Sequence, residues 1–290
     1  MERFHKKCLI CASTDLEPID RFVEDHLVCC SKCGFVFANA IPSSEELINY
    51  YSDYPIKSHR SDVTLKRYKT LLDEFEAFRQ NNKILDIGCG TGYFLDEAKK
   101  RGWDVFGTEY SSESITNCRN RGIVIHEGQL QIDNYRNEEF DVITSFEVIE
   151  HINDPKEELG KIHRLLRVKG LLYITTPNFS SLSKHFGGSE WSIVNYPEHL
   201  SYYSAGTLDL LLKNSGFDRK WVMTTGVSIS RFKASKNIEG QENVDPENDD
   251  EKLRVKMETN TLLKFAKWSI NSFLKFFKIG DSLKAAYVKR

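Results

Sequence analysis

The sequence predicts a doubly wound α/β fold, in which helices cover both faces of a mostly parallel sheet. From residue 83 onward, short apolar strands alternate with helical stretches. A glycine-rich turn follows the first of these strands, and several helical stretches end at a glycine. Such alternation predicts parallel strands, because each crossover helix returns the chain to the same edge of the sheet.

The strands of this region are short runs rich in β-branched and aromatic residues, predicted at 84–87, 105–108, 123–125, 141–144 and 171–174. The helices between them are predicted at 93–101, 111–121 and 154–167, with closing glycines at Gly102, Gly122 and Gly170. A later helix at 207–214 precedes a strand at 221–229. Residues 282–289 also have strand-like content.

The N-terminal 40 residues predict a zinc ribbon. Cys8 and Cys11 form one Cys-x2-Cys pair, and Cys30 and Cys33 form a second after an 18-residue gap. Four thiolates at this spacing are typical of a structural zinc site, which leaves no coordination position for a substrate. Cys29 is an alternative ligand to Cys30. A segment of about 35 residues buries too little surface to fold alone, so metal binding would supply folding energy.

Residues 41–80 are predicted to form a helical connector between the ribbon and the sheet. Ser43 and Glu46 have the spacing of a capping box at the start of one helix. A second helix is predicted over residues 61–78, because apolar side chains recur there at intervals of three and four.

The glycine-rich turn is the strongest candidate for a binding site. Asp86 is followed by Gly88, Gly90 and Gly92, and a helix begins directly afterwards. Glycines allow close approach of a ligand to the backbone, and the helix start presents free N–H groups. A dinucleotide fingerprint needs its third glycine one residue later, so we expect a ligand with carboxylate and ammonium groups instead. Glu109 ends the next strand, where an acid accepts hydrogen bonds from ribose hydroxyls.

These motifs resemble class I S-adenosylmethionine-dependent methyltransferases, in particular the ubiquinone-biosynthesis O-methyltransferase branch. The resemblance covers about residues 80–232, including segments 140–152, 171–178 and 197–200. The cysteine segment resembles the zinc-binding segment that precedes bacterial sugar methyltransferases. The resemblance implies a Rossmann-like, seven-stranded sheet that ends in a hairpin. Residues 282–289 would then pair with 221–230, and the methyltransferase domain would comprise 81–234 with 281–290.

The resemblance also implies which residues bind S-adenosylmethionine. The methionine end would contact Asp86 and Gly88, the ribose Glu109, and the sulfonium side Phe146. Gln129 would lie at the adenine, although many relatives carry aspartate at this position. The complete set of implied cofactor-binding residues is Asp86, Gly88, Gly90, Gly92, Glu109, Gln129, Leu130 and Phe146.

The candidate catalytic residues are His199, Glu147 and His151. His199 lies in an aromatic-rich segment, 178–206, that is expected over the carboxyl edge of the sheet, where it would take a proton from a substrate hydroxyl. A packed loop histidine is the alternative. Glu147, Glu150 and His151 match positions that bind a divalent metal in the resembling branch, and they would hold Mg²⁺. We favour an orienting role for this turn, because related enzymes without a metal also carry these residues.

The expected function is S-adenosylmethionine-dependent methyl transfer to a hydroxyl of a small polar or sugar-linked acceptor, in cell-envelope polysaccharide synthesis. A sugar C-methyltransferase, an RNA methyltransferase and a non-catalytic binding module remain alternatives. With 40 Lys and Arg against 42 Asp and Glu, the net charge is −2. Nucleic acid is therefore not an expected partner, because binding it requires a basic face.

The C-terminal part predicts an acidic loop at 235–250 and a basic amphipathic helix at 251–280. Aromatic residues mark one side of this helix, and its other side carries Lys264, Lys267, Lys275 and Lys278. This pattern suits an anionic membrane surface, and packing on the protein's own domain is the alternative. No signal peptide or membrane-spanning run is evident, so we expect a cytoplasmic protein with peripheral contact at the inner face of the membrane.

Overall fold

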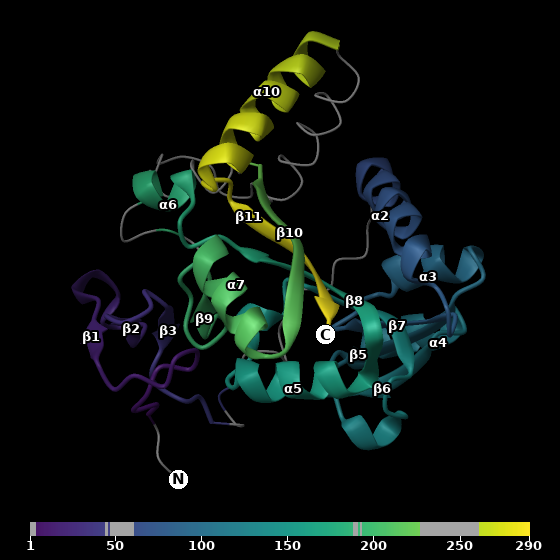
Figure 1. Ribbon diagram of the computed structural model, residues 1–290, viewed down its shortest axis with the longest axis horizontal. Helices are drawn as coiled ribbons and strands as arrows, with labels where there is room; N and C mark the ends of the chain where they lie inside the picture. The colour runs from purple at the N-terminus through teal and green to yellow at the C-terminus, as the bar shows by residue number, and fades with distance from the viewer. Residues whose placement is uncertain (1–3, 44–45, 47–60, 188–190, 192, 227–260) are drawn as a thin grey trace. The chain divides into compact units, whose positions relative to one another are not determined.

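The computed structural model describes residues 4–43, 46, 61–187, 191, 193–226 and 261–290 (Figure 1). A seven-stranded sheet forms the centre of the fold. Its strands are β4 (Lys83–Ile87), β5 (Asp104–Glu109), β6 (Val124–Glu127), β7 (Phe140–Phe146), β8 (Leu166–Pro177), β10 (Phe217–Thr225) and β11 (Ser282–Lys289). They are hydrogen-bonded in the order β10-β11-β8-β7-β4-β5-β6. The predicted seven-stranded α/β fold is thus confirmed.

Strand β4 occupies the middle of the parallel part of this sheet. It pairs in parallel with β5 and with β7, so that Ile84 lies opposite both Val105 and Val142. Strand β11 lies between β10 and β8, which agrees with the predicted pairing of 282–289. The predicted strand at 221–229 instead spans 217–225, and residues 227–229 lie outside the described residues.

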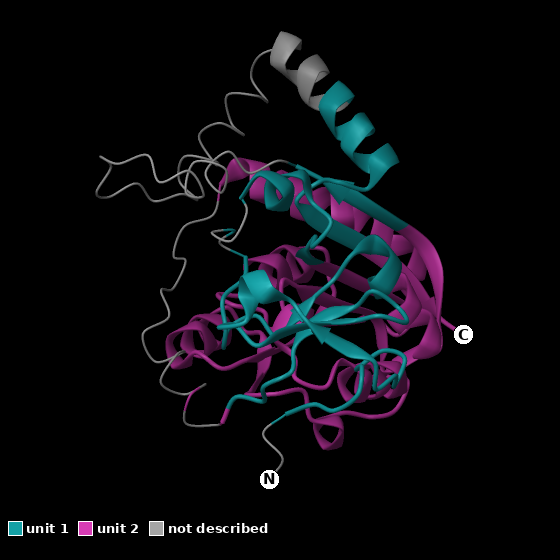
Figure 2. Ribbon diagram, turned by 90° about the vertical axis from the view of Figure 1, so that its left-hand side faces the viewer, with its two compact units in different colours: residues 1–42, 176–208, 222–284 teal, residues 43–175, 209–221, 285–290 magenta. Residues whose placement is uncertain are grey.

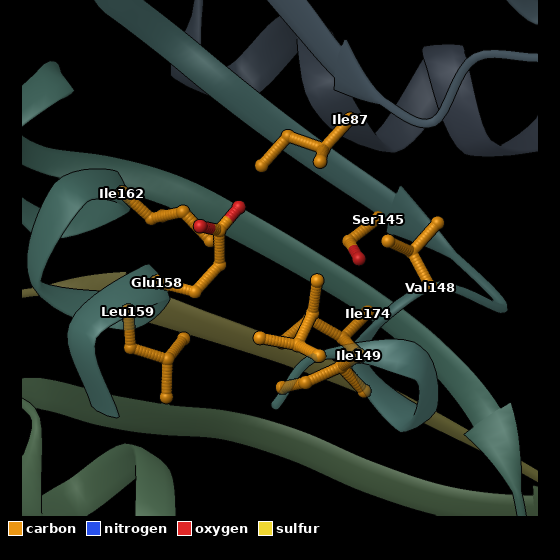
Figure 3. Close-up of a pocket in the computed structure, with 9 residues that line it drawn as sticks. Ile87, Ser145, Val148, Ile149, Glu158, Leu159, Ile162 and Ile174 are labelled. Carbon is orange, nitrogen blue, oxygen red and sulfur yellow. The ribbon is translucent and has the colours of Figure 1, made fainter. Parts of the chain in front are cut away.

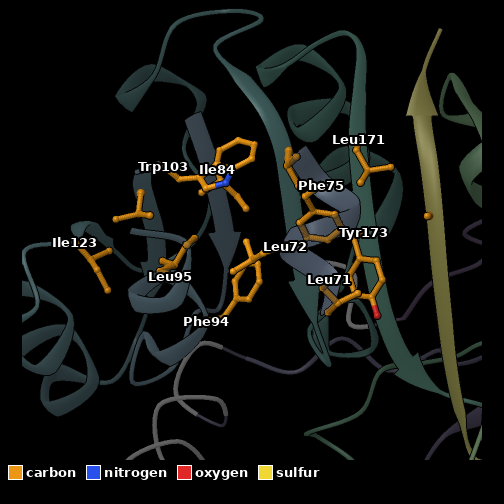
Figure 4. Packing of buried hydrophobic residues seen from close by; sticks show 14 of the residues in the cluster. Leu71, Leu72, Phe75, Ile84, Phe94, Leu95, Trp103, Ile123, Leu171 and Tyr173 are labelled. Carbon is orange, nitrogen blue, oxygen red and sulfur yellow. The ribbon is translucent and has the colours of Figure 1, made fainter. Parts of the chain in front are cut away.

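The helices near the sheet begin and end close to their predicted limits. They are α2 (Asp62–Phe75), α3 (Tyr93–Lys100), α4 (Ser112–Asn120), α5 (Pro155–Leu165) and α7 (Ala205–Asn214). Figure 4 shows how Leu72 and Phe75 of α2 join Phe94 of α3 in a buried apolar cluster with the sheet. This cluster places α3, and the glycine-rich turn before it, firmly against β4 and β5.

The connector carries the caps that its sequence predicts. The N–H of Ser43 donates to Glu46 Oε2 at 2.7 Å, and the N–H of Glu46 donates to Ser43 Oγ at 3.2 Å. The rest of that predicted helix lies outside the described residues. Ser61 caps α2 by accepting the N–H of Thr64 at 3.1 Å. A 3₁₀ turn, η2 (Glu76–Phe78), continues α2 to the predicted end.

The boundary between α5 and β8 differs from the prediction. The helix ends at Leu165 instead of 167, and β8 begins directly at Leu166. Arg167 Nε bonds Asp141 Oδ1 at 2.6 Å, which holds this stretch beside β7. Gly170 therefore lies within the strand and does not close the helix. A Cβ there would lie 3.0 Å from the carbonyl oxygen of Asp141, so the glycine allows close strand contact.

The chain divides into two compact units (Figure 2). Unit 1 comprises residues 1–42, 176–208 and 222–284, and unit 2 comprises 43–175, 209–221 and 285–290. Most of the parallel strands and the glycine-rich turn belong to unit 2. The cysteine segment, the segment with His199 and the C-terminal helix belong to unit 1.

Unit 1 contains a second, four-stranded antiparallel sheet. It consists of β1 (Leu16–Pro18), β2 (Leu27–Cys30), β3 (Val36–Ala38) and β9 (Ser201–Tyr202), in that order. Strand β9 comes from the segment 178–206, and its Tyr202 lies opposite Val36 of β3. Trp191 and Leu200 share a buried cluster with Phe22 and Leu27. The cysteine segment and the His199 segment therefore form one folded body.

Helix α10 (Thr261–Phe277) precedes β11 in unit 1. Thr224 Oγ1 donates to the carbonyl oxygen of Leu274 at 2.8 Å, and the Leu274 side chain is buried. The predicted acidic loop, and the predicted start of this helix at 251–260, lie outside the described residues. Within the described parts of the chain, no helix has the length and apolar character needed to cross a membrane.

Candidate cofactor site and catalytic residues

The glycine-rich turn connects β4 to α3. Gly88, Gly90 and Gly92 all have a positive φ, at 65°, 53° and 76°, and this left-handed backbone favours glycine. A Cβ on Gly90 would meet no atom within 4 Å. The backbone is therefore open to a ligand at Gly90, and a side chain there would occupy the ligand's space.

Thr108 on β5 holds this turn in place. Its Oγ1 accepts the N–H of Gly88 at 3.3 Å, and its carbonyl oxygen accepts the N–H of Cys89 at 3.0 Å. Thr108 was not among the predicted site residues. Its place one residue before Glu109 is the signal that would have identified it.

Asp86 is a buried carboxyl at the end of β4. Its side chain is 2% exposed, and Thr144 Oγ1 donates to Asp86 Oδ1 at 2.7 Å. Burial raises the pKa of Asp86 to about 8, although the hydrogen bond from Thr144 acts in the opposite direction. A ligand ammonium group near this carboxyl would favour its ionised form. The site therefore fits the charged methionine end of S-adenosylmethionine.

Glu109 joins the glycine-rich turn to the start of α4. Its Oε2 accepts the N–H of Gly90 at 2.8 Å, and its Oε1 accepts the N–H groups of Tyr110 and Ser111 at 2.8 and 3.0 Å. A carboxylate has about four acceptor positions. About one position on Oε2 thus remains for a ligand hydroxyl, and the other three hold the protein's own backbone.

The predicted adenine side of the site follows β6. Leu130 is buried, whereas Gln129 is exposed. Burial raises the pKa of the Tyr110 hydroxyl, and its hydrogen bond with Gln129 lowers it. Tyr110 is nonetheless 61% exposed and directly follows Glu109. Tyr110 was not among the predicted site residues, and its place directly after Glu109 would have indicated it.

Phe146, at the end of β7, packs within an aromatic group. Its ring centroid lies 5.1 Å from that of Phe94, 5.5 Å from that of Tyr173 and 6.2 Å from that of Tyr68. Phe146 remains only partly buried. These contacts fix the ring at the carboxyl end of β7, next to the turn that carries Glu147.

The turn after β7 is held by hydrogen bonds to β8. Glu147 has a φ of 54°, which is uncommon for a residue with a side chain. Its N–H donates to the carbonyl oxygen of Thr175 at 2.9 Å and contacts Thr175 Oγ1 at 3.2 Å. Glu150 and His151 follow in a 3₁₀ turn, η4 (Ile149–His151), where the Glu150 side chain is 2% exposed. The exposed Glu147 and the buried Glu150 thus differ strongly in their surroundings.

A small apolar cavity lies beside this turn (Figure 3). Its lining residues are Ile87, Ser145, Val148, Ile149, Ile152, Glu158, Leu159, Ile162 and Ile174. Glu158 contributes a carboxyl whose pKa burial raises and Lys161 lowers. The lining includes none of the predicted cofactor or catalytic residues, so the cavity is a packing gap between the sheet and α5.

His199 belongs to unit 1, where its ring and backbone are both held. Its Nδ1 lies 2.6 Å from the carbonyl oxygen of Ile193, and Tyr202 Oη donates to the carbonyl oxygen of His199 at 2.9 Å. A carbonyl oxygen can only accept, so Nδ1 carries the proton in this bond. A neutral His199 therefore has its lone pair on Nε2, which is the form required of a general base.

The four predicted zinc ligands lie together in unit 1. Their sulfur atoms are all within 4.8 Å of one another, with 3.5 Å between those of Cys8 and Cys33 and between those of Cys11 and Cys30. Tetrahedral zinc with bonds of about 2.3 Å places sulfurs about 3.8 Å apart. The cysteines therefore fit zinc. Cys30, and not Cys29, faces the other three sulfurs.

Comparison with known proteins identifies the family. A family model described as "Methyltransferase domain" matches residues 57–219. A ubiquinone biosynthesis O-methyltransferase of Cereibacter sphaeroides is 33% identical over 170 residues, which cover 52% of this chain and 67% of that protein. A protein of the same name from Pseudomonas aeruginosa is 30% identical over 103 residues, which cover 33% of this chain and only 44% of the relative.

Solved structures share the fold. A S-adenosylmethionine-dependent methyltransferase from Archaeoglobus fulgidus has a TM-score of 0.53 at 16% identity, covering 79% of this chain and 94% of its own. Phosphoethanolamine N-methyltransferase 2 of Haemonchus contortus, solved with S-adenosylmethionine, has a TM-score of 0.50 at 18% identity and covers 77% of this chain and 52% of its own. Since the family match spans more than half of the sequence and the sheet agrees, the chain belongs to the methyltransferase domain family and has the class I S-adenosylmethionine-dependent fold.

Proposed function

We propose that the protein transfers the methyl group of S-adenosylmethionine to a hydroxyl of a small polar or sugar-linked acceptor. The observation that supports a hydroxyl acceptor is the bond between His199 Nδ1 and the carbonyl oxygen of Ile193. In this bond Nδ1 carries the proton, so Nε2 is the ring nitrogen that would accept a proton from the acceptor. The relatives named as O-methyltransferases agree with an oxygen acceptor.

The residues of unit 2 would bind and orient the cofactor. When bound, S-adenosylmethionine supplies an electrophilic methyl group on a sulfonium. Asp86 would balance its positive charge from a buried position, the open backbone at Gly90 would admit it, and Glu109 would accept a ribose hydroxyl. Fixing the cofactor in this way would lower the entropic part of the barrier to direct methyl transfer.

His199 would act as the general base. A hydroxyl is a weak nucleophile, so removing its proton as the methyl group arrives favours the reaction. Nε2 would accept this proton, while the bond from Nδ1 to Ile193 holds the ring orientation during the transfer. Tyr202 fixes the His199 backbone as well, because its hydroxyl donates to the His199 carbonyl oxygen.

For Glu147, Glu150 and His151 we propose an orienting role and not a Mg²⁺ site. The bonds from the Glu147 N–H to Thr175 show that the turn itself is tightly held. Glu147→Gly should then preserve thermal stability, because glycine accepts the positive φ, whereas Glu147→Ala should lower it. Turnover should be unchanged when Mg²⁺ is omitted. A strict Mg²⁺ requirement that Glu150→Gln abolishes would establish a catalytic metal instead.

The four cysteines would hold a structural zinc ion. Their sulfur spacing supports this assignment, and four thiolates leave the ion no position for a substrate. The resemblance to sugar methyltransferases that carry such a segment is what supports a sugar-linked acceptor and a role in cell-envelope polysaccharide synthesis.

The experiment that tests this function measures S-adenosylhomocysteine and the methylated product together. The full chain is incubated with S-adenosylmethionine and a panel of nucleotide sugars, lipid-linked sugars and catechols. An O-methyl product, identified by NMR, would support the proposal. A C-methyl product, methylated RNA, or cofactor binding without any turnover would each identify one of the alternatives.

His199→Gln provides the residue-level test. It should reduce turnover with little change in S-adenosylhomocysteine affinity, and raising the pH should partly restore activity with an acidic hydroxyl. His185→Gln is the matched control, because His185 lies in the same segment on α6 (Leu182–Gly187) and is exposed. Equal turnover in both variants would exclude His199 as the base.

A further inference from the structure

We propose that the C-terminal end of α10 docks on an anionic membrane surface. Four apolar side chains there, which we call the aromatic end, are exposed by 52%, 55%, 79% and 54%: Ile270, Phe273, Phe276 and Phe277. Three of them touch, with ring centroids 4.6 Å apart for Phe273 and Phe277 and 5.0 Å apart for Phe276 and Phe277. This is a continuous aromatic surface in contact with solvent, and such surfaces mark interaction sites.

The helix is attached to its unit through other residues. The Leu274 side chain is 2% exposed, and the Asn271 Oδ1 accepts the N–H of Gly226 at 3.1 Å. At about 100° per residue, Leu274 lies about 100° and Asn271 about 160° around the helix from Phe273. The attachment therefore leaves the aromatic end uncovered.

The charge around the aromatic end indicates the kind of partner. Residues 261–278 contain four lysines and neither aspartate nor glutamate, although the whole chain has a net charge of −2. Lys275 and Lys278 are exposed beside the aromatic rings. Aromatic side chains enter the headgroup region of a bilayer, and lysines are attracted by acidic lipids. The combination fits a peripheral contact with an acidic lipid surface.

A second copy of the chain would fit this surface less well. A two-fold contact pairs the same patch on both subunits, so the lysines of the two helices would be brought together. Such like-charge contacts disfavour association. An acidic bilayer would instead attract Lys275 and Lys278 while its interface receives the rings.

The test uses the full chain and vesicles of phosphatidylcholine, with or without phosphatidylglycerol, in co-sedimentation at low and high salt. We expect binding to the anionic vesicles that weakens strongly at high salt, because exposed charges are screened within about 8 Å at physiological ionic strength. Lys275→Gln with Lys278→Gln should weaken vesicle binding about twenty-five-fold, given roughly fivefold for each lysine. The charge-matched control is Lys69→Gln with Lys156→Gln, two exposed lysines elsewhere.

The aromatic contribution is tested separately. Phe273→Ser with Phe276→Ser should remove binding to anionic vesicles, whereas Phe186→Ser, which alters a phenylalanine that is 57% exposed elsewhere, should not. Unchanged S-adenosylhomocysteine affinity and melting temperature would show that the variants fold. Equal binding to neutral and anionic vesicles, or no binding to either, would overturn the proposal. A lipid-free dimer in sedimentation velocity that Phe276→Ser dissociates would overturn it in favour of a second copy.

Discussion

The backbone N–H of Gly90 donates a 2.8 Å hydrogen bond to the carboxylate of Glu109. This bond connects the turn after β4 with the end of β5, the two elements that carry Gly90 and Glu109 of the proposed cofactor site. The same carboxylate accepts the N–H groups of Tyr110 and Ser111. One side chain thus holds both the turn and the start of α4.

Glu109→Gln should therefore weaken cofactor binding about tenfold to a hundredfold. The amide keeps the shape of the side chain. Its NH₂ group would face backbone N–H groups, which are also donors, so at least one hydrogen bond to Glu109 would be lost. Hydrogen bonds to charged groups contribute about 1.5–3 kcal/mol. Calorimetric titration with S-adenosylhomocysteine measures the change. Glu113→Gln, an exposed acid in the first turn of α4, is the matched control. Equal affinity of the two variants would show that Glu109 does not organise the site.

Asp86 should make the stability of the free protein fall as pH rises from about 4 to about 8. Burial raises its folded-state pKa to about 8, whereas an unfolded aspartate titrates near about 3.9. Between these values the folded chain keeps a proton that the unfolded chain has released, so rising pH favours unfolding. Asp86→Asn has no such proton and can still accept the bond from Thr144.

The difference between wild type and Asp86→Asn is therefore the quantity to measure. Thermal unfolding between pH 5 and pH 8 should show the variant gaining stability relative to wild type as pH rises. S-adenosylmethionine should reduce this gap, because its positive charge favours the ionised carboxyl. A constant difference across the range would mean that Asp86 is ionised in the free protein.

Gly107→Ala should disturb the proposed cofactor site by displacing the glycine-rich turn. A Cβ at this position would lie 2.7 Å from Cys89 Sγ and 2.9 Å from Ile125 Cδ1. Overpacking of this kind costs about 1–3 kcal/mol and would shift the turn that contains Cys89. Cys89→Ala in the same chain removes one clash, so it should restore part of the stability and part of the S-adenosylhomocysteine affinity.

Gly160→Ala serves as the matched substitution. Gly160 lies within α5, and a Cβ there would meet no atom within 4 Å. Alanine should stabilise this helix by about 0.5–1 kcal/mol. Chemical denaturation measures the stability of both variants. A similar loss of stability in each would show that the space around the added Cβ does not decide the effect.

Loss of the zinc ion should remove methyl transfer while preserving cofactor affinity. Strand β9 begins two residues after His199 and pairs with β3, the strand that follows Cys33, the last of the four predicted zinc ligands. Cys8→Ser should lower the zinc content and loosen this sheet, whereas Asp86 and Glu109 lie in unit 2. Elemental analysis, titration with S-adenosylhomocysteine and turnover are measured on one preparation. Full turnover in a zinc-free Cys8→Ser protein would disprove the link.

Cys29→Ser is the control for this experiment. Cys29 neighbours a ligand in sequence, but its sulfur lies outside the group of four. It should keep one zinc per chain and normal turnover. If Cys29→Ser lost zinc and Cys30→Ser kept it, the ligand assignment would have to be exchanged.

The elements that the sequence predicts well are those with local signals. Strand β4 is an apolar run ended by glycines, and α2 begins at a serine whose side chain caps it. Ser43 and Glu46 form the expected capping box for the same reason. In the two caps the deciding contacts join residues three positions apart. For β4 the signal is the local run of apolar residues before the glycines.

The features that were missed depend on contacts between distant parts of the chain. The start of β8 is set by the ion pair of Arg167 with Asp141, and not by the glycine three residues later. The small residue at Gly107 is explained by the sulfur of Cys89, which no periodicity reveals. Pairing of β3 with β9 likewise joins segments that look unrelated in the sequence. The residue types of the site were accessible to prediction, but the contacts that position them were not.

Residues 1–42 and the segment 178–206 both contribute strands to the antiparallel sheet of unit 1, so removing the first 42 residues would disrupt that sheet. A shortened chain that began at residue 43 would lack β3, which supplies the neighbouring strand of β9. It would also expose Trp191 and Tyr202, which are buried in the cluster with Phe22 and Leu27. An unpaired strand beside newly exposed aromatic residues is a template for aggregation. The cysteine segment therefore stabilises the segment that carries His199.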